Sequence, residues 1–228
     1  MSVLPGLRTC LRAKSPRAGA SAALKKIGIF GGSFNPVHLG HLILAQDALE
    51  RFGLEKVIFI PCAQPPHKSC ADMAAPEHRL AMLKLALKDD ARMVASALEM
   101  ERGGVSYTID TLRRLKELDP EAQYYFIIGG DSLIELHTWK EIDELLGLCE
   151  VITLRRPGLQ ALPAADSLQL KAPWPEKLLS NVFTGHLVDI SSTDIRRRVR
   201  SDRSIRYFVP FGVEMYIVNQ ELYRSGEK

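Results

Sequence analysis

The chain has 228 residues, of which 46% are hydrophobic and 25% charged, a composition typical of a globular protein with one sizeable core. Its apolar runs are shorter than a membrane span, so we expect no membrane association. The formal net charge of +3 is misleading, because the first 26 residues carry six basic side chains and no acidic one. The remainder has 24 basic against 27 acidic residues. We therefore expect no nucleic-acid partner.

Residues 1–25 precede the first predicted strand and are rich in Arg, Ala and Ser. Transit peptides share this composition, but the segment lacks amphipathic periodicity, so we favour a disordered extension. Residues 26–228 are predicted to form a single domain. The cysteines are irregularly spaced without a C-x-x-C pair, which favours reduced thiols in a cytoplasmic protein; they are Cys10, Cys62, Cys70 and Cys149. A zinc site on Cys62, His67 and Cys70 is a much weaker alternative.

Strands and helices are predicted to alternate along the chain. The strands fall at 27–30, 57–60, 93–100, 124–128, 151–154 and 187–190, and the helices at 42–49, 78–88, 108–118, 140–146, 193–200 and 211–223. Residues 155–180 hold four prolines and are predicted to be a long loop with room for one short helix. Strands separated by helices pair in parallel, so the pattern predicts an α/β fold. It is an open, doubly wound, mostly parallel Rossmann-like sheet with helices on both faces and a short helical C-terminal segment.

The most informative segment runs from Gly31 to His41 and has the sequence GGSFNPVHLGH. Glycines in the turn between a strand and a helix leave backbone N–H groups free, and the helix dipole adds positive potential, so this segment suits a phosphate group. His38 and His41 share one face of the helix start. We interpret them as donors to a triphosphate and to the charge that develops on it during transfer. A capping histidine with a core histidine, or a metal-binding pair, are the alternatives.

Two further helix starts suit small anions. Thr108 begins a helix whose free N–H groups could bind a carboxylate. Ser191 and Ser192 begin another helix, and Arg196 in its first turn can reach the same anion.

Two single residues have two interpretations each, and a third has one ordinary interpretation. Lys68 follows a pair of prolines that stiffen its loop, which favours a phosphate contact over a solvated surface lysine. Asp131 comes after Gly129 at a strand end, where it could bind a ribose or adenine group, or cap a helix. Trp139 would pack in the core of an ordinary protein.

The segment from Gly31 to His41 resembles the nucleotide-binding motif of the nucleotidyltransferase α/β phosphodiesterase superfamily, in its (T/H)-x-G-H form. Three more segments narrow the resemblance to the bacterial nicotinate-nucleotide adenylyltransferases: PCAQPPHK at 61–68, SYTIDTL at 106–112 and ISSTDIR at 190–196. The resemblance extends from about residue 26 to about residue 224. Asn35 stands where many members of the family have aspartate.

The resemblance implies specific roles for residues of this chain. ATP would be bound by Gly31, Gly32, Ser33, Phe34, His38, His41, Gly129, Asp131, Ile190, Ser191, Ser192 and Arg196. Nicotinate mononucleotide would be bound by Asn35, Lys68, Tyr107, Thr108, Trp139 and Lys140, with the ring of Trp139 stacked on the pyridine. The catalytic residues would be His38, His41, Lys68 and Arg196. Mg²⁺ would arrive with ATP, without a dedicated metal site in the protein.

The reaction that the resemblance implies is transfer of AMP from ATP to the 5′-phosphate of nicotinate mononucleotide, which yields nicotinate adenine dinucleotide and pyrophosphate in NAD biosynthesis. A phosphate acceptor is already an anionic nucleophile at neutral pH, so we expect positioning and charge stabilisation rather than a general base. One alternative is a nucleotidyltransferase with another acceptor, such as phosphopantetheine. The other is a nucleotide-binding regulator without activity. The sequence leaves a homo-oligomer open.

Overall fold

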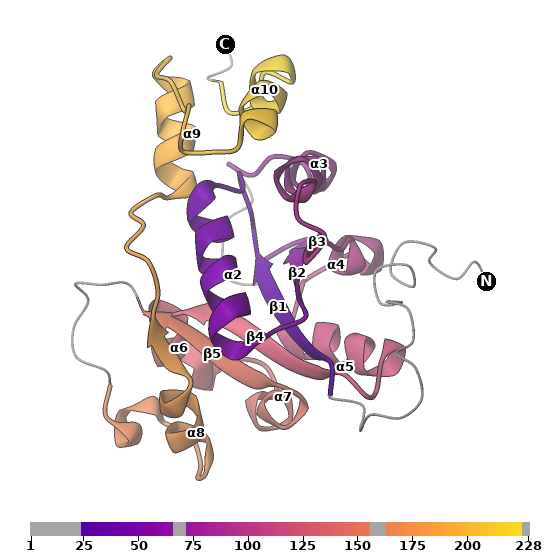
Figure 1. The fold of residues 1–228 in the computed structure, drawn as a ribbon, viewed down its shortest axis with the longest axis vertical. Helices are drawn as coiled ribbons and strands as arrows, with labels where there is room; N and C mark the ends of the chain where they lie inside the picture. The colour runs from indigo at the N-terminus through magenta and orange to yellow at the C-terminus, as the bar shows by residue number, and fades with distance from the viewer. Residues whose placement is uncertain (1–23, 66–71, 156–162, 225–228) are drawn as a thin grey trace.

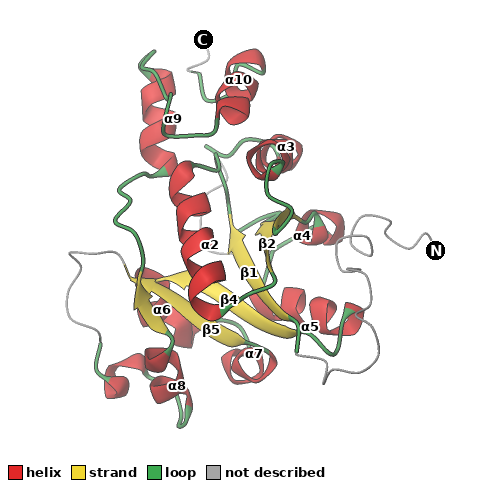
Figure 2. Ribbon diagram, viewed as in Figure 1, coloured by secondary structure: helices red, strands yellow, loops and turns green. Residues whose placement is uncertain are grey.

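The computed structural model describes residues 24–65, 72–155 and 163–224. Six strands form one sheet with the order β3-β2-β1-β4-β5-β6, and every neighbouring pair is parallel (Figures 1 and 2). The strands are β1 (Lys26–Gly32), β2 (Lys56–Pro61), β3 (Met93–Ala95), β4 (Gln123–Gly129), β5 (Glu150–Arg155) and β6 (Val182–Thr184). The predicted open parallel sheet is confirmed.

Helices cover both faces of this sheet. They are α2 (Leu39–Phe52), α3 (Pro76–Leu87), α4 (Leu98–Arg102), α5 (Thr108–Leu118), α6 (Gly130–Glu135), α7 (Ile142–Leu148), α8 (Trp174–Ser180), α9 (Ser192–Arg200) and α10 (Phe211–Asn219), with short 3₁₀ turns η1 (Leu136–Thr138) and η2 (Ala165–Leu168). One hydrophobic core lies between the sheet and α2, α3, α9 and α10, and the other between the sheet and α4 to α8. Figure 1 shows α9 and α10 together at one end of the molecule.

The central strands form because their residues are apolar on both faces. Every residue of β2 is buried, as are Tyr124 to Ile128 in β4, which is the pattern of a parallel strand covered from both sides. Helix α2 ends at Gly53, whose φ of 60° is the left-handed conformation that glycine adopts at helix ends without steric cost.

The chain leaves the neighbouring strands β1 and β4 toward opposite edges of the sheet. After β1 it passes to β2 and β3, and after β4 it passes to β5 and β6. The carboxyl ends of these two strands, at Gly32 and Gly129, therefore flank the switch point of the sheet. Open α/β sheets bind their ligands in the crevice at such a point.

Three predicted details are wrong. The strand predicted at 93–100 ends at Ala95, because β3 pairs with β2 over three residues only and good helix formers begin α4 at Leu98. The strand predicted at 187–190 is an irregular segment, since the end of β5 is already paired with β6 at 182–184. Gly31 and Gly32 lie in β1 itself and not in the turn after it.

Two predicted thiols lie inside the molecule. Cys62 and Cys149 are buried, and burial raises the pKa of the Cys149 thiol to about 12. The other two cysteines, most of the N-terminal extension, and Lys68 with its neighbours in the loop lie outside the described residues, as does most of the proposed zinc site. Among the described helices, none has the length and apolar character needed to cross a membrane.

Candidate active site

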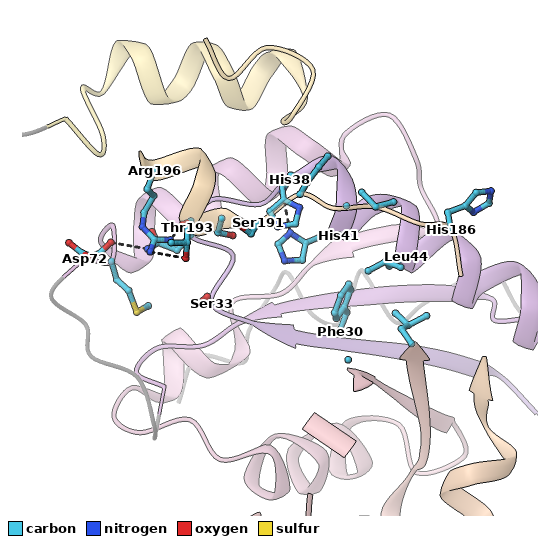
Figure 3. A pocket seen from close by; sticks show the side chains of 18 of the residues that line it. Phe30, Ser33, His38, His41, Leu44, Asp72, His186, Ser191, Thr193 and Arg196 are labelled. Carbon is cyan, nitrogen blue, oxygen red and sulfur yellow. Dashed lines mark hydrogen bonds between the residues drawn. The ribbon is translucent and has the colours of Figure 1, made fainter. Parts of the chain in front are cut away.

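A cavity of about 450 Å³ lies at the carboxyl ends of β1, β4 and β5. The N-termini of α2 and α9 border it, and the segment between β6 and α9 forms another wall (Figure 3). Many of the residues predicted from the sequence meet here: Ser33, Asn35, His38, His41, Gly129, Ile190, Ser191, Ser192 and Arg196. Figure 3 shows Arg196 and Asp72 at one end of the cavity, His186 at the other, and the histidine pair between them.

The starts of α2 and α9 supply positive potential to the cavity. His38 is the N-cap of α2, in an extended conformation that ends the preceding turn. Ser191 is the N-cap of α9, and its Oγ accepts a hydrogen bond of 3.1 Å from the backbone N–H of Asp194. Helix N-termini stabilise anions through their dipoles and their unused N–H groups. Two of them at one cavity favour a ligand with several negative charges.

The imidazole rings of His38 and His41 are stacked, with ring centroids 3.7 Å apart and an interplanar angle of 29°. The His41 ring also contacts Phe34 and Phe30 at centroid distances of 5.1 and 5.9 Å, both edge-on. His38 is 7% exposed. The sheet, the loop and the helix therefore fix both rings before any ligand binds, which is the condition for effective charge stabilisation.

Gly40 makes this arrangement possible. A Cβ atom at position 40 would lie 3.0 Å from His38 Nδ1 and 3.3 Å from Val188 Cγ1. The absence of a side chain lets the His38 ring and the segment before α9 approach each other across the helix start.

Arg196 brings a guanidinium from α9 to the loop after β1. Its NH1 donates to the backbone carbonyl of Asn35 at 2.9 Å, and its NH2 donates to Thr193 Oγ1 at 3.4 Å. Its Nε is buried and has no hydrogen-bond partner among the described residues. A buried unused donor of a cation at the edge of this cavity is suited to an anion.

Both polar atoms of the Asn35 side chain are hydrogen-bonded within the protein. Its Nδ2 donates to the carbonyl of Asp72 at 2.9 Å, while its Oδ1 accepts from the N–H of Ala74 at 3.0 Å and from the hydroxyl of Tyr223 at 2.8 Å. Burial raises the pKa of that hydroxyl, so it stays a donor. Asn35 thus joins the loop after β1 to the loop before α3. The predicted role of Asn35 in binding the acceptor stays a prediction.

Four of the six residues predicted to bind the nicotinate nucleotide form a second group, which does not line the cavity: Tyr107, Thr108, Trp139 and Lys140. Lys140 Nζ lies 4.8 Å from the centroid of the Tyr107 ring and 3.9 Å from Asp110 Oδ1. Trp139 is half-buried and meets Phe126 edge-on at 5.8 Å. Thr108 is the first residue of α5, beside Tyr107 at the N-cap. The structure therefore brings these four predicted residues to the other face of the sheet.

Four predicted ATP-binding residues lie beside the cavity without lining it. A Cβ on Gly31 would lie 3.3 Å from Phe126, and one on Gly32 would lie 3.2 Å from Phe34, so packing also explains these glycines. The side chain of Phe34 is 1% exposed. Asp131 is an exposed residue of the first turn of α6, whose N-cap is Gly129; the alternative of a helix cap at Asp131 is wrong.

Residues 29–198 match the cytidylyltransferase-like family. A relative from Desulfitobacterium hafniense strain Y51, described as a probable nicotinate-nucleotide adenylyltransferase, is 44% identical over 205 residues, which are 90% of this chain and 98% of the relative. One with the same description from Opitutus terrae is 44% identical over 202 residues, covering 89% of this chain and all of the relative. This chain belongs to the nicotinate-nucleotide adenylyltransferase family.

The solved structures support the fold assignment for this adenylyltransferase family member. The Plasmodium falciparum nicotinic acid mononucleotide adenylyltransferase, solved in complex with NaAD, superposes with a TM-score of 0.67 at 21% sequence identity. The match covers 87% of this chain and 97% of the Plasmodium chain. The sheet and its covering helices are therefore those of a known nucleotidyltransferase fold.

Several residues of the site were not singled out by the sequence analysis. Val188 lines the cavity from the segment that was predicted to be a strand at 187–190, and His186 lines it from the position just before that segment. Leu154 lines it from the end of β5, and the position of β5 beside β4 could have pointed to it. Arg155, which follows Leu154 and matches the family at this strand end, also lines the cavity. Arg79, a buried arginine on the apolar face of α3, was likewise not predicted from the sequence.

Proposed function

We propose that this chain transfers the adenylyl group of ATP to nicotinate mononucleotide, which yields nicotinate adenine dinucleotide and pyrophosphate in NAD biosynthesis. The observation that carries the proposal is the stacked pair His38–His41 at the start of α2, which faces the start of α9 across one cavity at the switch point of the sheet. Membership of the family and the second group of residues around Trp139 support the choice of acceptor.

The chemistry requires a positioned nucleophile and a stabilised phosphorus centre. An oxygen of the acceptor's 5′-phosphate attacks the α-phosphorus of ATP; a P–O bond forms there, and the bond to the β-phosphate bridging oxygen breaks. The electron pair of that bond leaves with pyrophosphate. His38, His41 and Arg196 are placed to donate hydrogen bonds to the oxygens on which charge accumulates. The attacking phosphate is already an anion, so no residue needs to remove a proton.

We also propose that Mg²⁺ accompanies ATP. Within the described ranges, no three His, Cys, Asp or Glu side chains are grouped so as to hold a metal ion. The polar side chains at the cavity are mainly donors, which suit phosphate oxygens rather than a cation. Such a site fits Mg²⁺ held by the phosphates and its own waters. When bound, the ion neutralises charge on the pyrophosphate leaving group.

We assign the nicotinate ring to the group formed by Tyr107, Thr108, Trp139 and Lys140. The N-terminus of α5 at Thr108 offers N–H groups to a carboxylate, and Trp139 offers an aromatic surface to a pyridine. A cation lies nearby, since Lys140 packs over Tyr107. Lys68 lies outside the described residues, and its phosphate contact remains a prediction.

Pyrophosphate release tests the proposal directly. With purified protein, Mg²⁺ and ATP, we expect pyrophosphate only when nicotinate mononucleotide is added, in equal amount to the dinucleotide product. ATP binding without release would indicate a regulator instead. The single domain at 26–228, the location in the cytoplasm and a homo-oligomer also stay proposals; the first is supported by the one sheet that contains all six described strands.

A further inference from the structure

Arg79 is a buried charge that the reaction described above does not use. It lies in the second turn of α3 and is 1% exposed. Its guanidinium donates to three backbone carbonyls from three segments: Nε to Ala74 at 3.0 Å, NH1 to Ser33 at 2.9 Å and NH2 to Ala63 at 3.3 Å. These carbonyls belong to the loop before α3, the loop after β1 and the loop after β2.

A buried guanidinium is costly unless its charge is compensated. In the part of the chain that the structure describes, no carboxylate lies within ion-pair distance of Arg79. Its oxygen partners are the negative ends of peptide dipoles, and its NH1 also donates to Cys62 Sγ at 3.9 Å. Two of the three loops that supply these carbonyls, the loop after β1 and the loop before α3, border the cavity, so this buried charge acts next to the place where the ligand would bind.

The bond to Ser33 orients one particular peptide group. The Ser33–Phe34 peptide is trans, and in a planar trans peptide the C=O and N–H bonds point in opposite directions. Because the Ser33 carbonyl points to Arg79, the N–H of Phe34 points away from α3. That N–H donates to no other group among the described residues.

Phe34 is also held in an uncommon conformation. Its φ is 45°, in the left-handed region that a bulky side chain adopts only when the surroundings impose it. Its ring is packed between Phe30, Phe59 and His41. The packed ring on one side and the Arg79–Ser33 bond on the other determine where this backbone N–H points.

Two more carbonyls of the loop after β1 accept hydrogen bonds from side chains. Arg196 donates to the carbonyl of Asn35 at 2.9 Å, and Ser192 Oγ donates to the carbonyl of Pro36 at 2.9 Å. Three carbonyls of the loop after β1 are thus occupied by side chains from α3 and α9. A carbonyl that turned toward a phosphate would repel it, so these donors keep the negative ends of the peptides engaged.

We propose that Arg79 is a positioning residue for the adenylyl transfer: its guanidinium fork fixes the loop after β1 so that the peptide between Ser33, which lines the cavity, and Phe34 donates its N–H to a substrate phosphate. The proposal rests on the proposed function. It requires the fork geometry and not the charge alone, because one ammonium group cannot replace donors that hold carbonyls of three segments.

Two substitutions separate geometry from charge. Arg79→Lys keeps the positive charge, whereas Arg79→Gln removes it and keeps two donors. We expect both variants to lose about 10- to 100-fold in kcat, with a smaller change in the KM for ATP, because a misdirected donor costs most where charge develops. Arg92→Lys is the matched control: Arg92 is an exposed arginine paired with Asp90, and its kcat should stay within twofold of the wild type.

Restored activity in Arg79→Lys alone would show that the charge suffices and would overturn the geometric role. A folded variant with kcat within threefold of the wild type would reduce Arg79 to a core residue. If both variants fail to fold, nuclear magnetic resonance on the wild-type protein tests the proposed contact of the Phe34 N–H. On addition of ATP and Mg²⁺, the Phe34 amide resonance should shift and its hydrogen exchange should slow at least about tenfold. An unchanged amide in a protein that binds ATP overturns the proposal. A wild-type protein that releases no pyrophosphate contradicts the proposed function instead.

Discussion

The Nδ1 atom of His41 lies 3.2 Å from the backbone nitrogen of His38 and accepts its hydrogen bond. An accepting Nδ1 carries no proton, so the neutral ring of His41 has its proton on Nε2. The backbone of the helix start therefore selects the tautomer that leaves a donor at the far edge of the ring. Since the His38 ring is stacked on that of His41, the two histidines act as one rigid unit at the cavity.

Replacement of His41 by alanine should lower kcat by about 10²–10³-fold, the cost of losing one preorganised donor at a developing charge. The fold should survive, because the ring lies at the edge of the cavity. Steady-state kinetics with circular dichroism checks both statements. His137→Ala is the control and should keep activity within twofold; it removes a ring in η1 that is hydrogen-bonded to the carbonyl of Ile134 in α6. A loss under tenfold, or an unfolded His41 variant, would assign His41 to structure.

Gly40→Ala should separate activity from stability. Alanine favours a helix over glycine by about 1 kcal/mol, so the free energy of unfolding should change by less than about that amount. The new methyl group would press on the His38 ring and on Val188, and we expect kcat/KM for ATP to fall roughly tenfold. Gly147→Ala is a matched control in α7, where a Cβ meets nothing within 4 Å. Equal activities of the two variants would show that the contact at His38 has no functional consequence.

Trp139→Ala should raise the KM for nicotinate mononucleotide by about tenfold or more, since stacking of a base on an aromatic ring is worth about 1–3 kcal/mol. The KM for ATP should change less than twofold, because Trp139 does not line the ATP cavity. Trp174→Ala serves as control, as its indole packs under Lys177 in α8. Parallel increases in both KM values would mean that Trp139 supports the sheet rather than the acceptor.

Glu99 should make stability depend on pH. It is buried, and this burial raises its pKa above the ordinary value of 4.5, although hydrogen bonds from Thr111 and Ser106 oppose the shift. Its contribution to stability is therefore complete below about pH 4.5 and is lost as the pH rises through the folded-state pKa. Glu99→Gln removes that loss. The unfolding free energy of the variant minus that of the wild type should rise with pH between 4.5 and 8 in urea titrations; a constant or falling difference would contradict the raised pKa.

The sequence predicts the sheet well because its strands carry their own signal. The apolar runs of β2 and β4 and the helical spacing of α5 are local patterns, and the alternation of elements fixes their parallel pairing. The bounds of the edge strands β3 and β6 are predicted less well. Both β3 and β6 have three residues, and each pairs with only three of the six residues of its neighbouring strand, which no local pattern indicates.

In the candidate site, too, the residues that belong to a local motif are predicted, and those that depend on tertiary contacts are not. His38, His41 and Arg196 are predicted because their motif places them at helix starts, and the structure brings them to one cavity. Arg79 is invisible to such reasoning, because its partners are backbone carbonyls distant in sequence. The side-chain bonds of Asn35 to the loop before α3 and to Tyr223 likewise depend on tertiary contacts that no local pattern encodes.

The measurement that tests this account most directly is an acceptor comparison with purified protein. With ATP and Mg²⁺ in excess, kcat/KM is determined for nicotinate mononucleotide, nicotinamide mononucleotide and phosphopantetheine, by pyrophosphate release and by identification of the product. We expect nicotinate mononucleotide to have the highest kcat/KM of the three by at least about tenfold, because the free N–H groups at the start of α5 favour a carboxylate over a neutral amide. A higher kcat/KM for phosphopantetheine, or no release with any of the three, would contradict it.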